Sequence, residues 1–322
     1  MNKLYSEILA RVEVEIKGVE LPKTPTNLYD PIRYIMGLGG KRVRPVLTLL
    51  GNQLYKGNYE DAIHHAMAVE MFHNFTLVHD DVMDSADVRR GLPTVHKKWS
   101  SNIALLSGDG MLVAAYSLLQ KTSPETFSRT ARIFSDTALE VCEGQQLDMD
   151  FSELDSISME DYLGMIRQKT AVLLSGSLKI GAVVGGADDQ DLPNLEAFAE
   201  SLGLAFQVKD DYLDAFGSSE FGKVLGGDIM EGKRTWLTVK SLELLGGKGS
   251  QRLHEAYAIK DFDDRVKEVL MIYRELNIDK LAQQQVQEYS DIAQKSLAKM
   301  RGDEDAIETL SWLVDQLIGR TI

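Results

Sequence analysis

The sequence feature that most constrains this chain is an acidic motif that occurs twice, each time at the end of an apolar helical segment. Residues 78–84 read Val-His-Asp-Asp-Val-Met-Asp, and residues 208–214 read Val-Lys-Asp-Asp-Tyr-Leu-Asp. Aspartate is a poor residue for a helix interior, and apolar helices seldom carry carboxylates without a partner. One such motif is compatible with a solvated helix end. Two copies, each following an apolar helix, favour a functional site.

The spacing of the acids places them on shared helix faces. Positions i and i+4 of a helix lie on one face, so Asp80 and Asp84 project together, as do Asp210 and Asp214. The same face of the second helix carries Gln207 one turn earlier. We expect the two polar stripes to face each other and to form a cavity with carboxylates at its mouth.

Clustered carboxylates repel one another and raise one another's pKa unless a cation binds them. Oxygen ligands that are too few to enclose an ion suit Mg²⁺, which keeps waters and substrate phosphates in its coordination shell. An alternative site, the Glu70-x-x-His73 spacing of di-iron bundles, is disfavoured because that chemistry needs a second copy, which the chain lacks. The sequence therefore predicts a Mg²⁺ site with the candidate ligands Asp80, Asp81, Asp84, Asp210, Asp211 and Asp214.

Basic residues gather near glycines, as a phosphate site requires. Residues 37–45 read Gly-Leu-Gly-Gly-Lys-Arg-Val-Arg-Pro, a glycine-rich turn that leads into a helix start, where backbone amides favour an anion. We expect Lys41 and Arg44 to lie on one side of that helix. Further candidates are Arg89 and Arg90 after the first acidic motif, Lys169 with Thr170 inside a helical segment, and Lys223 and Lys233 at a loop with five glycines (217–232).

The overall composition excludes some classes of function. The formal charge of −14 argues against a nucleic-acid binder, which needs a basic surface. The single cysteine, Cys142, cannot form an intramolecular disulfide, and we expect it to fill space in the core. The most apolar stretch, residues 171–187, is interrupted by Lys179 and several glycines, and charged residues interrupt the N-terminal segment. We expect a cytoplasmic protein with no integral membrane segment and no nucleic-acid partner.

Helical periodicity dominates the chain, and start signals such as Ser123 before Pro124, or Ser158 three residues before Asp161, are frequent. We predict an all-α protein, with residues 1–322 forming one domain built as a large helical bundle around a central apolar cavity. The predicted helices span residues 2–19, 27–37, 42–55, 59–86, 100–120, 124–148, 158–183, 192–216, 233–246, 250–259, 261–275, 279–300 and 303–318.

Taken in order, these motifs resemble those of the trans-isoprenyl diphosphate synthases, also called polyprenyl synthetases, over nearly the whole chain. The resemblance rests on the 39–45 turn, both aspartate motifs with Arg89-Arg90-Gly91 and Phe206-Gln207, Gly144-Gln145, Lys169-Thr170, and Gly222-Lys223 with Asp228 and Lys233. The resemblance implies an all-α isoprenoid synthase fold, a homodimer, and transfer of an allylic group to isopentenyl diphosphate. The allylic substrates implied are dimethylallyl, geranyl and farnesyl diphosphate.

The same resemblance implies roles for individual residues. Asp80, Asp84 and Asp210 would bind three Mg²⁺ ions that hold the allylic diphosphate, with Asp81 and Asp214 as secondary ligands. Arg89, Lys169, Lys223 and Lys233 would contact that diphosphate. Gly40, Lys41, Arg44, His73 and Arg90 would bind isopentenyl diphosphate. Thr170 and Gln207 would lie near the reacting carbons, where oxygen dipoles can stabilise positive charge.

Product length depends on the residues that precede the first motif. In related enzymes, a bulky residue five positions before the first aspartate closes the cavity that holds the growing chain; here that residue is Phe75, followed by Thr76. Only one of the two is aromatic, and the motif has no insertion. This combination resembles the geranylgeranyl (C20) class, with farnesyl (C15) or longer products as alternatives.

Two other functions remain open. A class I terpene cyclase shares the first motif, but it normally replaces the second with an Asn/Ser/Glu triad and has no use for a second diphosphate site. A non-catalytic subunit that modulates a partner synthase tends to lose one aspartate motif, and this chain keeps both.

Overall fold

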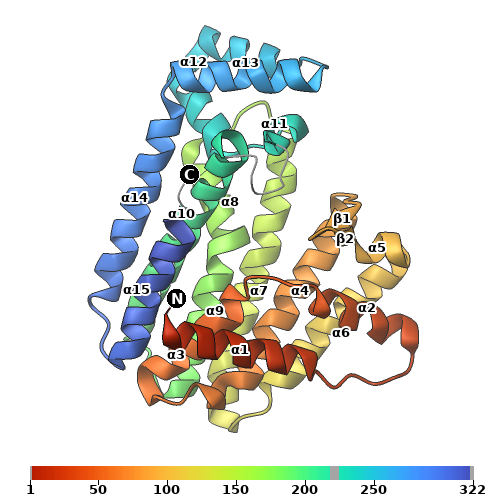
Figure 1. Ribbon diagram of the computed structural model, residues 1–322, viewed down its shortest axis with the longest axis vertical. Helices are drawn as coiled ribbons and strands as arrows, with labels where there is room; N and C mark the ends of the chain where they lie inside the picture. The colour runs from red at the N-terminus through yellow and green to blue at the C-terminus, as the bar shows by residue number, and fades with distance from the viewer. Residues whose placement is uncertain (1, 218–224, 320–322) are drawn as a thin grey trace. The chain divides into compact units, whose positions relative to one another are not determined.

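The computed structural model describes residues 2–217 and 225–319, so the predicted diphosphate contact Lys223 lies outside the described residues. The described chain is helical almost throughout (Figure 1), which confirms the all-α class. Within those two ranges, the only strands are β1 (Val88–Arg89) and β2 (Leu92–Pro93), which pair antiparallel in the loop after the first aspartate motif.

The helices group into two compact units. Unit 1 comprises Met1–Ser135, Gly176–Leu192 and Arg301–Leu310, and unit 2 comprises Asp136–Ser175, Pro193–Met300 and Ser311–Ile322. Each unit carries one aspartate motif. The arrangement of residues 1–322 as a single domain stays a prediction.

Unit 1 is built around α4 (Ile63–Met83), the helix that ends in the first aspartate motif. This helix is apolar on nearly every side, as a helix buried on all faces must be. It contacts α1 (Lys3–Lys17), α2 (Thr26–Gly37), α3 (Val43–Lys56), η1 (Tyr59–Ala62), α5 (Val95–Lys98) and, most extensively, α6 (Ser101–Leu119). α7 (Pro124–Ser152), α9 (Val172–Gly185) and α15 (Glu304–Ile318) contribute residues to both units.

Unit 2 contains α8 (Met159–Ile166), a π-helical turn η2 (Arg167–Ala171), most of α10 (Leu192–Phe216), α11 (Gly227–Glu231), α12 (Trp236–Tyr257), α13 (Phe262–Glu275) and α14 (Ile278–Leu297). Its core combines aromatic side chains from three of these helices, Tyr162, Trp236 and Tyr273, with aliphatic residues such as Val208. Val208, the first residue of the second aspartate motif, belongs to this core, so the motif lies against the core of unit 2.

The start signals in the sequence operate as expected. Ser158 and Asp161 form a reciprocal capping box at the start of α8, and Ser123 accepts the backbone N–H of Thr126 at 3.2 Å where α7 begins. The prediction of one α-helix over residues 158–183 was wrong, because the π-helical turn interrupts it. The predicted break between helices 233–246 and 250–259 is confirmed, because Gly246 and Gly247 within α12 have non-helical backbone angles that separate two helical parts. Helix α11 within the glycine-rich loop was not predicted.

The π-helical turn lies against two glycines that permit close backbone contact. A Cβ at Gly144 of α7 would lie 2.7 Å from the carbonyl carbon of Gln168, and a Cβ at Gly203 of α10 would lie 2.6 Å from the Cα of Ala171. Both distances are too short for real carbon contacts. The two glycines therefore let α7 and α10 approach the turn that carries Lys169 and Thr170, and π-turns of this kind are frequent at functional sites.

Two expectations about apolar residues were wrong. Cys142 is exposed rather than part of the core.

Residues 171–187 are not the most membrane-like segment: α6, with a mean hydropathy of 1.4, is the one helix among the described residues that is long and apolar enough to cross a bilayer. A single such helix is weak evidence for a membrane span, because core helices pass the same test. Only 33% of its apolar window is buried, and Leu106 and Val113 are 62% and 67% exposed.

The close contact at Gly144 predicts that Gly144→Ala destabilises the fold by about 1–3 kcal/mol, because the added methyl group meets backbone that cannot move aside. Gly164→Ala is the matched control: Gly164 lies in α8 with no atom near the position of its missing Cβ, and alanine there should stabilise the helix by about 0.5–1 kcal/mol. Urea unfolding of both variants measures the difference. Equal shifts in the two variants would contradict the packing argument.

Candidate active site

The first aspartate motif ends α4 with its acids on different faces. Asp84 is the C-cap of the helix and is exposed, Asp80 is half-buried, and Asp81 is only 1% exposed. Oδ1 of Asp81 accepts a hydrogen bond from Nε of Arg89 at 2.8 Å, and Nη2 of Arg89 forms an ion pair with the same oxygen at 2.8 Å. Arg89 comes from β1, so the short hairpin after the motif supplies the charge that compensates the buried aspartate.

The second motif, on α10, has the same division between a buried middle acid and less buried neighbours. Asp211 is 4% exposed, whereas Asp210 and Asp214 are half-buried. Oδ2 of Asp211 accepts from the hydroxyl of Tyr162 at 2.7 Å and from the backbone N–H of Trp236 at 2.8 Å. Burial raises the pKa of Asp211 to about 6, although these hydrogen bonds oppose that rise.

Asp214 ties the second motif to the glycine-rich segment that follows it. Its Oδ2 accepts the backbone N–H of Asp228 at 2.9 Å in the first turn of α11, and its carbonyl accepts the N–H of Gly226 at 2.7 Å. Lys233 forms ion pairs with Asp228 at 3.2 Å and Glu231 at 2.8 Å. Burial alone would lower the pKa of Lys233, but these two carboxylates outweigh it and raise the pKa.

The π-helical turn presents two predicted site residues beside α10. Lys169 forms an ion pair with Asp148 of α7. The Thr170 hydroxyl lies 3.5 Å from Oε1 of Gln207, and Nε2 of Gln207 donates to Oδ1 of Asp211 at 2.9 Å. Unit 2 thus brings Thr170 and Gln207 together with Asp211 of the second aspartate motif, and Lys169 precedes Thr170 on the same turn.

The donor set of the aspartate motifs fits Mg²⁺ with a bound substrate. Among the described residues, no three acidic, histidine or cysteine side chains converge to hold a metal by themselves. Asp80 and Asp84 offer oxygen atoms only, and Mg²⁺ prefers to complete such a set with water and phosphate oxygens. In the part of the chain that the structure describes, Oδ2 of Asp81 is buried without a hydrogen-bond partner, which leaves it able to accept from a metal-bound water.

In unit 1, the glycine-rich turn before α3 differs from the sequence prediction. Helix α3 begins at Val43, and Arg42 before it has a left-handed backbone with φ of 49°. Lys41 therefore precedes the helix, and the expectation that Lys41 and Arg44 lie on one helical side was wrong. A helix that already began at Lys41 would have placed Lys41 and Arg44 on one side. The side-chain contacts of Arg42 instead hold its backbone in the left-handed conformation, and the helix begins only at Val43.

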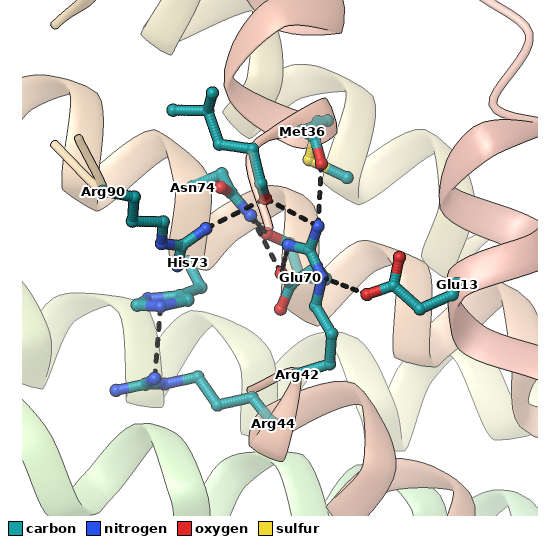
Figure 2. Close-up of polar contacts among 9 residues, drawn as sticks. Glu13, Met36, Arg42, Arg44, Glu70, His73, Asn74 and Arg90 are labelled. Atoms are coloured by element: carbon teal, nitrogen blue, oxygen red, sulfur yellow. Dashed lines mark hydrogen bonds and ion pairs between the residues drawn. The ribbon is translucent and has the colours of Figure 1, made fainter. Parts of the chain in front are cut away.

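Figure 2 shows that Arg42 is the centre of a buried network. Its guanidinium donates to Glu70 at 2.6 Å and to Glu13 at 3.0 Å, and also to the backbone carbonyls of Met36 at 3.0 Å and Leu38 at 2.8 Å. Arg42 and Glu70 are 4% and 2% exposed. This network fixes the turn that carries Gly39 to Lys41, and it argues against the di-iron alternative because the Glu70 carboxylate is already bound to a cation.

Arg44 and His73 form a second pair beside the Arg42 network (Figure 2). Nη1 of Arg44 lies 3.2 Å from Nε2 of His73. A guanidinium can only donate, so His73 accepts at Nε2 and is the neutral tautomer with its proton on Nδ1. Burial lowers the pKa of His73 well below its usual value, and the charge of Arg44 lowers it further. Burial lowers the pKa of Arg44 to about 10, against the opposing effect of Glu70.

Arg90 completes the positive cluster from the hairpin after α4. Its Nη1 donates to the carbonyl of Leu38 at 3.1 Å, and a Cβ at Gly40 would lie 3.0 Å from its guanidinium. Glycine at position 40 thus lets the guanidinium lie flat against the turn. Among residues 2–217 and 225–319, the guanidinium of Arg44 contacts a neutral histidine and that of Arg90 a backbone carbonyl, with no carboxylate paired to either, so their positive charge is available to an anion.

Phe75 lies one turn before the first motif, within an aromatic cluster on α4. Its ring is 5.5 Å from that of Phe72 and 4.6 Å from that of His79. Gly108 of α6 makes room for both rings, because a Cβ there would overlap His79 and lie 3.4 Å from Phe75. The hydroxyl of Thr76 donates to the carbonyl of His73 at 2.8 Å. The role of Phe75 as a floor stays a prediction.

Comparison with known proteins identifies the family. The profile of the polyprenyl synthetase family matches residues 25–275. A short chain isoprenyl diphosphate synthase of Methanothermobacter thermautotrophicus is 35% identical over 319 residues, which cover 98% of this chain and 96% of that protein. A geranylgeranyl diphosphate synthase of Methanosarcina mazei is 40% identical over 247 residues, 74% of this chain and 76% of that protein. The crystal structure of a geranylgeranyl pyrophosphate synthase matches with a TM-score of 0.94 and 40% identity over 100% of both chains.

The chain belongs to the polyprenyl synthetase family. Members of this family are prenyltransferases, which agrees with the resemblance inferred from the ordered motifs.

Sequence reasoning missed the residues that hold the synthetase's site residues in place. Arg42, Tyr162 and the backbone N–H of Trp236 were not assigned a role, and Glu70 was considered only as a ligand of the disfavoured di-iron site. A charged residue inside an apolar helix signals a buried partner, and Glu70 on α4 gave that signal. The phenol of Tyr162 gave no such signal, because a tyrosine on an apolar helix face is ordinary core packing.

The neutral state of His73 predicts how the stability of the synthetase depends on pH. Because the folded pKa lies below the unfolded value of about 6.5, only the unfolded chain binds a proton between the two values, so stability is lost as the pH falls below 6.5. The loss should reach at most about 1.4 kcal/mol per pH unit.

His73→Gln removes this titration but keeps an oxygen that can accept from Arg44. The variant should therefore show a shallower fall in the free energy of unfolding between pH 7 and pH 5 than the unaltered chain, as measured by urea unfolding at each pH. Parallel curves for the two proteins would show that His73 is not held neutral.

Proposed function

We propose that this synthetase condenses isopentenyl diphosphate with the allylic substrates dimethylallyl, geranyl and farnesyl diphosphate, with geranylgeranyl diphosphate (C20) as its main product. The observation that carries the proposal is the common design of the two aspartate motifs: each buries and compensates its middle acid and leaves the first and third aspartates less buried. Farnesyl (C15) or longer products are the alternatives.

The first step breaks the C–O bond between the allylic carbon and its diphosphate, and the bonding electrons leave with the diphosphate. Arg89, Lys169 and Lys233 stabilise that leaving group by positive charge, which requires Lys169 and Lys233 to exchange their present carboxylate partners for phosphate. The oxygen atoms of Thr170 and Gln207 stabilise the positive charge that develops on carbon. The chain needs no nucleophilic side chain for this step.

The second step forms the new carbon–carbon bond. The double bond of isopentenyl diphosphate attacks the allylic cation, and a proton then leaves the product cation and is taken up by the released diphosphate. Lys41, Arg44 and Arg90 bind the diphosphate of isopentenyl diphosphate, with the turn at Gly40 beneath it. Neutral His73 adds no charge of its own and holds Arg44 in place through Nε2.

Asp80, Asp84 and Asp210 would hold Mg²⁺ in this scheme, with Asp81 and Asp214 as secondary ligands and three ions in all. When bound, the metal neutralises charge on the leaving diphosphate. The hydrogen bonds of Asp81 to Arg89, and of Asp211 to Tyr162 and Trp236, support outer roles for both middle aspartates.

The exposed apolar side of α6 supports the proposal of a homodimer. Leu105, Leu106 and Val113 lie on this helix and are exposed, while the opposite side packs on α4. An apolar helix with so much of its surface in water favours a protein partner, and a second copy of the chain satisfies this without a further component. Light scattering of the purified protein tests the dimer. We place the protein in the cytoplasm.

A direct assay tests the function. Purified protein with Mg²⁺, radiolabelled isopentenyl diphosphate and a C5, C10 or C15 primer should give an organic-soluble product, with C20 as the main chain length by mass spectrometry. Asp84→Asn should lower the rate at least about 100-fold. Asp87→Asn is the matched control, because Asp87 lies three residues further on and pairs with Lys97 at 2.7 Å.

The possible negative results point to the other two functions. Absence of product with all three primers would favour the non-catalytic subunit. Conversion of an allylic diphosphate to a hydrocarbon without isopentenyl diphosphate would favour a terpene cyclase.

Product length tests the role of Phe75. Phe75→Ala should shift the main product to chains longer than C20, because it removes the bulk that limits the growing chain. Phe72→Ala is the control, since Phe72 belongs to the same aromatic cluster but is fully buried and points to Phe134. Chromatography of the products measures chain length, and an unchanged distribution in Phe75→Ala would refute the floor assignment.

A further inference from the structure

We infer that Asp211, the middle acid of the second aspartate motif, is a positioning residue that fixes which end of the Gln207 amide faces the reacting carbons. This inference rests on the proposed function, because it concerns the charge that develops in that reaction. All the hydrogen bonds that fix this orientation lie within unit 2.

Two donors hold Oδ2 of the Asp211 carboxylate, and one of them, a backbone N–H, can never act as an acceptor. The N–H of Trp236 belongs to the backbone at the start of α12, so it can only donate, and it donates to Oδ2 at 2.8 Å. The Tyr162 hydroxyl donates to the same oxygen at 2.7 Å. Oδ1 is left facing Gln207, one turn earlier on α10. An ionised carboxylate is an acceptor only.

These contacts determine the orientation of the Gln207 amide. Because Oδ1 of Asp211 can only accept, Gln207 must present its NH₂ group to it, and Nε2 does so at 2.9 Å. The carbonyl oxygen Oε1 is thereby directed to the Thr170 hydroxyl on the π-helical turn, 3.5 Å away. An amide oxygen attracts a nearby cation, whereas an amide NH₂ group repels it.

The orientation of the Gln207 amide therefore affects the rate of the reaction. A glutamine without a fixed partner could turn its amide over at little cost, and the reaction would then meet a partial positive charge where it needs a negative one. Groups oriented in advance toward the developing charge contribute more than groups that must turn during the reaction. Asp211 supplies this orientation from a position where its own carboxylate is covered by protein.

Asp211→Asn makes a sharp test, because its outcome follows from the fixed donors. The N–H of Trp236 continues to demand an oxygen, so the asparagine places its own NH₂ group toward Gln207. Gln207 must then turn its amide over to accept with Oε1. We expect kcat to fall about 100-fold, with KM for both diphosphates and the Mg²⁺ concentration for half-maximal rate changed less than about threefold.

A second substitution should restore the orientation. In the double variant Asp211→Asn with Gln207→Glu, one carboxylate oxygen of residue 207 accepts from the asparagine and the other faces the reacting carbons. We expect kcat to recover at least about tenfold over Asp211→Asn. Gln207→Glu alone should be poorly active, because two carboxylates then face each other. A merely structural role of Asp211 predicts no rescue by a change at position 207.

A binding measurement tests the inference without turnover. An allylic diphosphate analogue with an ammonium group at the reacting centre should bind more tightly than its neutral carbon isostere, and Asp211→Asn should reduce that ratio of dissociation constants about tenfold. Tyr162→Phe is the matched control for stability: it removes one donor to Asp211 but leaves the amide orientation, so the ratio should hold.

The outcomes separate the two proposals. If the unaltered chain makes no prenyl product, the proposed function fails, and the binding ratio still reports on the orientation of Gln207. If Asp211→Asn raises the Mg²⁺ requirement about tenfold or more and the double variant is not rescued, Asp211 is a metal ligand and the inference is overturned. An unchanged binding ratio in Asp211→Asn overturns it as well.

Discussion

Each aspartate motif contains one buried carboxylate, and the structure of the motif depends on the hydrogen-bond donors that satisfy that carboxylate. Adjacent helical residues point about 100° apart, so a helix that exposes the first and third acids of each motif turns the middle one toward the protein interior. A buried carboxylate is destabilising unless donors satisfy it. Arg89 does so for Asp81, and Tyr162 with the N–H of Trp236 does so for Asp211.

In unit 1, three arginines, Arg42, Arg44 and Arg90, differ in whether carboxylates neutralise their charge. Glu70 and Glu13 neutralise Arg42, whose remaining donors hold the carbonyls of the glycine-rich turn. Arg44 and Arg90 face a neutral histidine and a backbone carbonyl instead. Arg42 and Arg44 are two residues apart, yet the first fixes the turn and the second keeps a charge that a diphosphate can use.

Much of the fold was predictable, because it depends on short-range patterns. Apolar periodicity gave the all-α class and most helix positions, and Ser158 with Asp161 gave the start of α8. The π-helical turn was missed because its sequence, Arg-Gln-Lys-Thr-Ala, is compatible with an ordinary helix. The turn depends on the close contacts that Gly144 and Gly203 allow from other parts of the chain, and spacing along a single helix does not contain that information.

The sequence by itself determined the candidate residues for the proposed chemistry: the two aspartate motifs, the basic turn before α3, and Lys169, Thr170 and Gln207. Charge, helical spacing and the order of the motifs along the chain are sufficient to select these candidates, because all three can be read without knowledge of the tertiary contacts. Only the tertiary structure decided the state of each group, such as the neutral tautomer of His73 or the amide orientation of Gln207. Such states depend on which donors and acceptors folding brings within hydrogen-bond distance, often from residues far apart in the sequence.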